Sequence, residues 1–263
     1  MLKTDSLILL RCPFVQRVSI SVTKYHIIIT GNTAVTCLYR LHVDVCLVCC
    51  SVIDVAFVLD SSFKSQGQSA WNEMISFVNS VIDRLSISEY ALRVAFVRYS
   101  NSGTVEFQFI TYSDSASTKQ RISSITYLGS SGNNLASALD LLRTQVFQSS
   151  AGARSLAPWV AVVVTDRSPN IRTGDTVSVA NQDRAATIQI IPVGILGPGQ
   201  LDRRLLFQIA FTADRVSTVN TYSELSTVVS QVTHWICNSH LGKYQIFANI
   251  IESKLLKNTG NIK

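Results

Sequence analysis

Between Cys50 and Cys237, apolar runs of strand length alternate with segments of helical periodicity. Several of the strand-like runs are apolar without interruption and rich in valine and isoleucine, which is typical of strands buried on both faces of a sheet. They are Ile53–Leu59, Leu92–Tyr99, Thr104–Ile110, Trp159–Thr165, Thr187–Val193 and Val216–Val219. This alternation predicts an α/β fold with a doubly wound, mostly parallel central sheet and helices on both faces.

The segments between these runs have the spacing of helices. In Ala70–Leu85 the apolar residues recur every three or four positions and form one stripe. The same spacing occurs in Leu135–Val146, Asp175–Ala186, Gln200–Ala210 and Tyr222–Ile236, and Gly199 and Thr221 stand where helices could begin. The runs Leu92–Tyr99 and Thr104–Ile110, joined by Ser-Asn-Ser-Gly, predict a hairpin that adds one antiparallel edge strand.

Charge and pattern divide the chain into three parts. A weakly patterned segment, 1–49, carries five lysines and arginines against two acidic residues, and a polar basic tail, 239–263, carries four against one. The main domain, 50–238, carries fourteen of each. A nucleic-acid-binding domain would show a basic stripe on its folded part, so we expect no nucleic-acid partner.

The cysteines lie at the borders of the main domain. Five precede it or stand at its start, Cys237 stands at its end, and the 186 residues between Cys50 and Cys237 contain none. This arrangement favours a disulfide that closes the domain at its neck, and hence an oxidising compartment. The alternative for Cys46-x-x-Cys49-Cys50 is a metal cluster, but no paired cysteine or histidine partner follows downstream.

Neither a secretory signal nor a membrane span is convincing in the sequence. Leu7–Leu10 is too short for the apolar core of a signal peptide. The apolar run Leu41–Leu59 is interrupted by Asp44 and Asp54, so we expect no membrane span.

Two strand-like runs end in an aspartate, Asp60 and Asp166. In doubly wound sheets, ligands bind beyond the carboxyl ends of the strands, so these carboxylates predict a site, although an aspartate there can also cap the next helix. No Gly-x-Gly-x-x-Gly, P-loop or Gly-x-Ser-x-Gly motif is present, and all four histidines fall in or near the ends. Ser62 stands where a phosphatase would need a second acid, so we expect no enzyme.

The ordered segments resemble a von Willebrand factor type A domain over about residues 50–238. The segments are Asp-x-Ser after the first strand, "GSSGNNLASALD", "VAVVVTD", "IQIIPVGI", "LLFQIA" and "HWIC". The resemblance implies a Rossmann-like sheet, extracellular adhesion or matrix assembly, and flanking cysteines that close the domain. Cys237 fits that closure, with Cys50 or Cys49 as its partner.

The resemblance also implies a metal-ion-dependent adhesion site, made of Asp-x-Ser-x-Ser, a threonine from a later loop and an aspartate after a further strand. Asp60, Ser62 and Asp166 match three of these ligands, and their oxygens suit Mg²⁺. The second serine is replaced by Lys64 and the threonine by Asn133.

Lys64 makes the site degenerate because an ammonium group repels a divalent ion. One hypothesis is that Lys64 is a cation surrogate that neutralises Asp60 and Asp166. Two alternatives are that Ser65 takes the place of the lost serine and Mg²⁺ is retained, or that neither arrangement holds.

We therefore expect a secreted, non-enzymatic module that binds a protein of the extracellular matrix or a collagen-like protein, with weak or no dependence on divalent metal and no other cofactor. Its expected binding face comprises 60–65, 129–134 and 166–172, with Ser65, Ser130, Ser131, Arg167 and Arg172 as contact residues. An intracellular scaffold of the same family and an unrecognised α/β enzyme are the alternatives.

Overall fold

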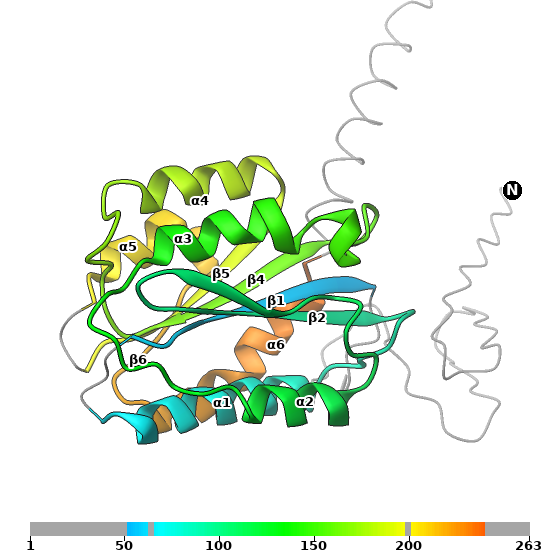
Figure 1. Cartoon of the computed structure of the whole chain (residues 1–263), viewed down its shortest axis with the longest axis horizontal. Coiled ribbons are helices and arrows are strands. Elements are labelled where there is room, and N and C mark those ends of the chain that lie inside the picture. Colours follow the sequence, from blue (N-terminus) through cyan, green and yellow to red (C-terminus); the bar gives the residue numbers. More distant parts are fainter. Residues whose placement is uncertain (1–51, 63–65, 198–200, 240–263) are drawn as a thin grey trace, which may run out of the picture.

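The computed structural model describes residues 52–62, 66–197 and 201–239. Six strands in this part of the chain form one sheet, in the order β3-β2-β1-β4-β5-β6 (Figure 1). Five are parallel, and β3 pairs antiparallel with β2 at one edge, as the hairpin predicted. The strands are β1 (Ile53–Asp60), β2 (Leu92–Tyr99), β3 (Gly103–Phe107), β4 (Trp159–Thr165), β5 (Ile188–Ile195) and β6 (Ser217–Val219). The predicted fold class is confirmed.

Helices cover both faces of the sheet (Figure 1). On one face lie α1 (Gln68–Ile82), α2 (Ser115–Ser123) and α6 (Val229–Cys237), and on the other lie α3 (Leu135–Leu141), α4 (Thr176–Ala185) and α5 (Arg203–Ile209). A π-helical turn, η1 (Leu142–Val146), extends α3, and short 3₁₀ turns are η2 (Ser149–Ala151), η3 (Ala213–Arg215) and η4 (Ser223–Val228). Among the described residues, no helix is both long and apolar enough to cross a membrane.

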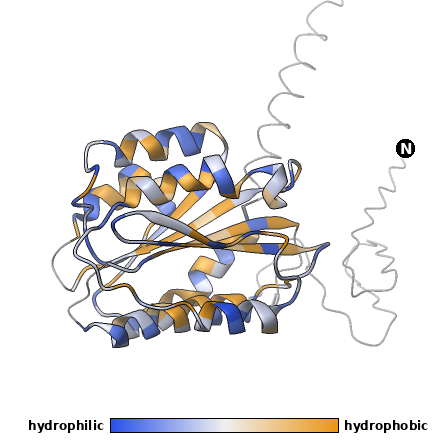
Figure 2. Ribbon diagram, in the orientation of Figure 1, coloured by the Kyte–Doolittle hydropathy of each residue, from blue (hydrophilic) through white to orange (hydrophobic). Residues whose placement is uncertain are grey.

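Each face of the sheet has its own hydrophobic core. All eight residues of β1 are buried, with Phe57 and Leu59 facing the α1–α6 core and Val58 facing the α3–α4 core. Figure 2 shows the central strands as largely hydrophobic and the helices as mixed. This is the pattern that burial of both sheet faces requires, because each helix turns only one stripe inward.

The structure differs from the expected elements in detail. α2 was not predicted, because its polar sequence buries only Thr118 and Ile122. The expected helix 135–146 is α3 followed by η1, and the expected helix 222–236 is η4 followed by α6. α5 begins at Arg203, where the Asp202 side chain caps it, and β3 ends at Phe107 rather than Ile110.

The strand order places the two aspartates on neighbouring strands. The chain runs from β1 to β2 and β3 on one side, then returns to β4 on the other side of β1. The carboxyl ends of β1 and β4 therefore meet at the switch point of the sheet, where doubly wound folds bind ligands.

The first and last described residues, Val52 and Ser239, lie at the opposite end of the sheet. Val52 precedes β1 there, and the Ser239 carbonyl accepts a hydrogen bond from Gln189 Nε2 at 3.0 Å near the start of β5. Cys237 is disulfide-bonded, and because the five other cysteines all lie within residues 1–51, its partner is outside the described residues. Pairing with Cys50 stays a prediction, as do the domain boundaries.

Candidate functional site

The carboxylate of Asp60 is the centre of the polar cluster at the switch point. It is fully buried at the end of β1 and accepts four hydrogen bonds from the described residues. Its Oδ1 accepts from Ser62 N at 2.8 Å and Ser62 Oγ at 2.6 Å, and its Oδ2 accepts from Asn133 Nδ2 at 2.7 Å and Thr165 Oγ1 at 3.0 Å. Four donors from the chain itself therefore occupy the four lone-pair positions of this carboxylate.

Three loops meet around this carboxylate. Ser62 forms an isolated parallel bridge with Ser130, which joins the loop after β1 to the loop before α3. Asn170 joins that second loop to the loop after β4, because its Oδ1 accepts from Asn133 N at 2.7 Å and its Nδ2 donates to Ser131 O at 2.9 Å. The described parts of the expected binding face thus form one surface.

Asp166 lies in the same region, directly after β4. It is 1% exposed, and its Oδ2 accepts a hydrogen bond from Tyr222 OH at 2.5 Å. Burial, followed by this bond to a carboxylate, raises the pKa of Tyr222 above its ordinary value, so the phenol is a neutral donor. Thr165, the last residue of β4, therefore contacts Asp60, whereas the next residue, Asp166, contacts Tyr222.

Tyr99 completes the cluster from β2. It is fully buried and pairs in register with Asp60. Burial, and then the charge of Asp60, raise the pKa of Tyr99 well above its ordinary value. Both tyrosines therefore remain neutral beside the two carboxylates.

Among the described residues, the cluster offers oxygen ligands for a divalent cation, but the Asn133 side chain is turned the wrong way for that role. Asn133, at the position of the family's ligand threonine, turns its amide Nδ2 toward Asp60, where a metal would need an oxygen. Its Oδ1 is buried and makes no hydrogen bond within the described part of the chain. Only a reversal of this amide would direct its carbonyl oxygen toward Asp60. The hydrogen bond from Asn133 Nδ2 to Asp60 Oδ2 opposes that reversal.

The other predicted residues fall into three groups. Ser131 and Arg172 are exposed, and Ser130 and Arg167 are half-buried, all near the cluster. Arg172 adopts a φ of 51° and its guanidinium binds Asp140 and Asp175, each at 2.8 Å, which raises its pKa. Lys64, Ser65 and Cys50 lie outside the described residues, so the cation-surrogate hypothesis stays a prediction.

Sequence reasoning missed three residues of the cluster: Tyr99, Thr165 and Tyr222. Tyr99 and Thr165 are the last residues of apolar strand-like runs, and no motif marks either of them. Strand alternation was the available signal, because Tyr99, Asp60 and Thr165 end adjacent strands of one sheet.

The model of the von Willebrand factor type A domain family matches residues 54–231. The chain belongs to this family. The von Willebrand factor A domain is 31% identical to human matrilin-3 over 193 residues, which are 70% of this chain and 37% of that protein. It is 28% identical to the mouse collagen alpha-5(VI) chain over 185 residues, 70% of this chain and 7% of that protein. The matched region is thus well under half of either relative.

Solved structures of the same fold include metal-bound members. Proximal thread matrix protein 1 from the mussel byssus aligns with a TM-score of 0.68 and 21% identity over 72% of this chain and 49% of its own. Another structure of that protein, with a zinc-occupied MIDAS motif, aligns with a TM-score of 0.66 and 22% identity, over 73% of this chain and 47% of its own. These likenesses support the fold.

Proposed function

We propose that this von Willebrand factor A domain binds a protein of the extracellular matrix, catalyses nothing, and contacts its partner without a bridging cation. The observation that carries the proposal is the Asp60 carboxylate, which is held by four donors of its own chain. These four hydrogen bonds hold the Asp60 carboxylate in place, and they leave the surrounding loops to make the contacts.

The relatives support a partner of the extracellular matrix. One of them is named as a collagen chain, and this chain matches a part of it and a part of matrilin-3. The disulfide at Cys237 supports an oxidising, extracellular location, because such bonds are rare in reducing compartments. The Ser131 and Arg172 side chains are exposed on the proposed binding face.

Binding of the full chain to immobilised triple-helical collagen tests this function. We expect saturable binding in EDTA that agrees within about twofold with binding in Mg²⁺, since no step needs the ion. Surface plasmon resonance in the two buffers is the measurement. Binding that is lost in EDTA and restored by Mg²⁺ would show that the cation bridges the partner.

A second prediction concerns the lost ligands themselves. Replacing Lys64 with serine and Asn133 with threonine restores the family's hydroxyl ligands and removes an ammonium charge. We expect Lys64→Ser/Asn133→Thr to bind Mn²⁺ at least tenfold more tightly than the native chain, measured by isothermal titration calorimetry. Adding Asp166→Ala to this variant should abolish the gain, because it removes a carboxylate ligand. Micromolar Mn²⁺ binding by the native chain would contradict both the cation-surrogate hypothesis and the proposal that the partner is bound without a bridging cation.

A further inference from the structure

The outward face of α5 carries two arginines and an aromatic ring. The Arg204 side chain is 88% exposed and Phe207 is 42% exposed. The guanidinium of Arg203 lies over the Phe207 ring, with Cζ 5.7 Å from the ring centroid. We call Arg203, Arg204 and Phe207 the α5 patch.

The arginines of the α5 patch stand where they cost helix stability. They are the first two residues of α5, whose first turn contains no acidic residue. The amino end of a helix carries a partial positive charge, so cations there are unfavourable. Arg204 forms an ion pair with Asp202, with Nε 3.3 Å from Oδ1. Arg203 forms no ion pair with an acidic side chain among the described residues. Positions that depart from such a local rule of helix stability are typical of functional sites.

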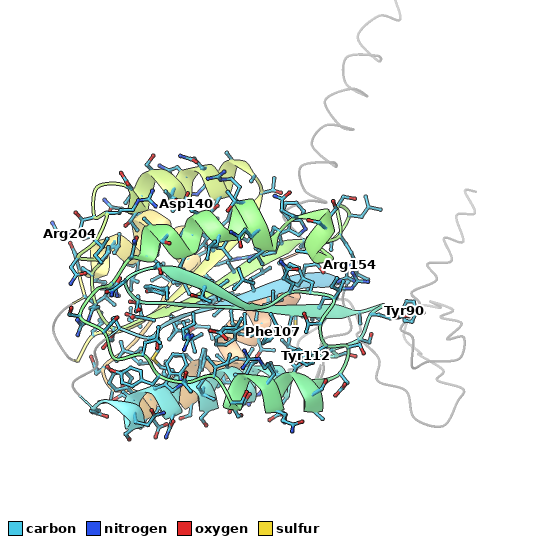
Figure 3. All side chains as sticks on the ribbon, viewed as in Figure 1. Tyr90, Phe107, Tyr112, Asp140, Arg154 and Arg204 are labelled. Carbon is cyan, nitrogen blue, oxygen red and sulfur yellow. The ribbon has the colours of Figure 1, made fainter. Side chains whose placement is uncertain are left out.

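The α5 patch lies beside the proposed binding face. Asp202 N donates to Ser168 Oγ at 2.8 Å, which attaches the start of α5 to the loop after β4. Figure 3 shows Arg204 at the end of the molecule opposite to Tyr90 and Arg154, which lie near the amino ends of the strands. The patch and the three loops therefore form one continuous end of the domain.

We infer that the α5 patch binds an acidic segment of a protein partner, with carboxylates on Arg203 and Arg204 and an apolar side chain on Phe207. The inference rests on the proposed function, in which no cation bridges the domain and its partner. The α5 patch supplies guanidinium groups that bind the partner's carboxylates instead. Arginine and aromatic residues are the types enriched at binding hot spots, and arginine pairs with carboxylates through two parallel hydrogen bonds.

A sulfated polysaccharide is the competing kind of ligand, and the patch fits it less well. Such polyanions bind through extended basic surfaces, whereas residues 50–238 carry equal numbers of basic and acidic side chains. The exposed Phe207 ring also offers apolar contact area that a polypeptide uses better than a sulfated sugar.

Selection of twelve-residue peptides from a random phage-displayed library against the full chain tests the inference. We expect the recovered peptides to be enriched in aspartate and glutamate beside an apolar residue. A recovered peptide should bind Arg203→Glu at least tenfold more weakly than the native chain and Phe207→Ser about fivefold more weakly. The matched control is Arg84→Glu, which makes the same charge change at an exposed arginine on the α1 side and should stay within twofold.

The outcomes separate this inference from the proposed function. Peptides without acidic enrichment, or equal binding to Arg203→Glu and the native chain, would overturn it. Displacement of the peptide by heparin oligosaccharide at concentrations below the peptide's own dissociation constant would assign the patch to a polysaccharide. If Arg203→Glu binds collagen like the native chain, the α5 patch is not the contact to that partner and the proposed function stands. If the native chain binds no collagen but acidic peptides still require Arg203, the proposed function fails and the patch stands.

Discussion

Asp54→Ala should lower the free energy of unfolding by about 3–5 kcal/mol, because it leaves a largely buried guanidinium without its partner. Asp54 is fully buried in β1. Its Oδ1 accepts from Arg154 Nε at 2.9 Å and Nη2 at 2.6 Å, and its Oδ2 accepts from the Arg154 backbone N at 2.6 Å. The loop before β4 is fixed to β1 by these bonds. Urea unfolding followed by circular dichroism measures the loss.

The size of this effect depends on burial rather than on the charge pair itself. The exposed pair between Arg172 and Asp175 has a similar distance, 2.8 Å, yet Asp175→Ala should cost less than about 1 kcal/mol. Burial outweighs the contacts to Arg154 and raises the pKa of Asp54, so the pair is costly to desolvate. We therefore expect Asp54→Leu/Arg154→Met to recover more than half of the stability lost in Asp54→Ala. A double variant that is less stable than Asp54→Ala would contradict this account.

The sheet could be predicted because its strands satisfy one strong condition, burial on both faces. The runs that became β1 and β4 are almost continuously apolar, which few other environments permit. α2 satisfies no such condition, since only two of its nine residues are buried. Its signal was local: Asp114 caps it by accepting from Ser117 N at 2.8 Å.

The site could be predicted only where a motif marks it. Asp60, Ser62, Asn133 and Asp166 stand at positions that the family resemblance identifies, and the first three meet in one hydrogen-bond network. Tyr222 contacts Asp166 across 56 residues of sequence. No local pattern encodes such a contact, because it depends on how η4 packs against the end of the sheet. The orientation of the Asn133 amide likewise depends on a residue distant in sequence, Asp60, to which it donates.

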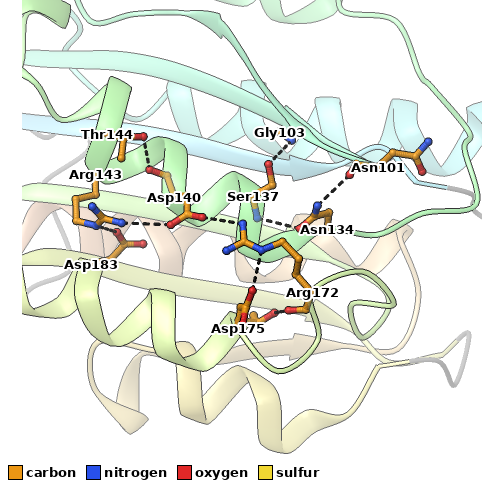
Figure 4. Close-up of polar contacts among 11 residues, drawn as sticks. Asn101, Gly103, Asn134, Ser137, Asp140, Arg143, Thr144, Arg172, Asp175 and Asp183 are labelled. Carbon is orange, nitrogen blue, oxygen red and sulfur yellow. Dashed lines mark hydrogen bonds and ion pairs between the residues drawn. The ribbon is translucent and has the colours of Figure 1, made fainter.

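A second carboxylate is buried with less compensation than Asp54. Asp183 on α4 is fully buried, and its nearest cation is Arg143 of η1, with Nε 3.9 Å from Oδ1 (Figure 4). Neither carboxylate oxygen makes a hydrogen bond within the part of the chain that the structure describes. Burial, partly offset by Arg143, raises the pKa of Asp183 to about 7, so the carboxyl is largely protonated in the folded state below neutral pH.

The raised pKa of Asp183 determines whether stability rises or falls with pH. The folded state binds the proton more tightly than the unfolded state, where the ordinary value of 3.8 applies. The contribution of Asp183 to stability is therefore fully present below about pH 4 and is lost as the pH rises through 7. The difference between the two pKa values corresponds to a loss of at most about 4 kcal/mol in the free energy of unfolding, since one pKa unit is about 1.4 kcal/mol.

Asp183→Asn should raise the free energy of unfolding at pH 8 by roughly 2 kcal/mol, because the amide keeps the shape of the acid without its charge. This gain in stability is smaller than the roughly 4 kcal/mol that the pKa difference allows, because Arg143 loses its counter-ion. Urea unfolding at intervals from pH 4 to pH 8 should show a flatter profile for the variant than for the native chain. Asp83→Asn, at a carboxylate that is 57% exposed, should change stability by about 0.5 kcal/mol or less and keep the native slope. A variant less stable than the native chain at pH 8 would mean that Arg143 stabilises the ionised Asp183 more strongly than burial opposes it, so that the carboxylate acts as a structural ion pair between α4 and η1.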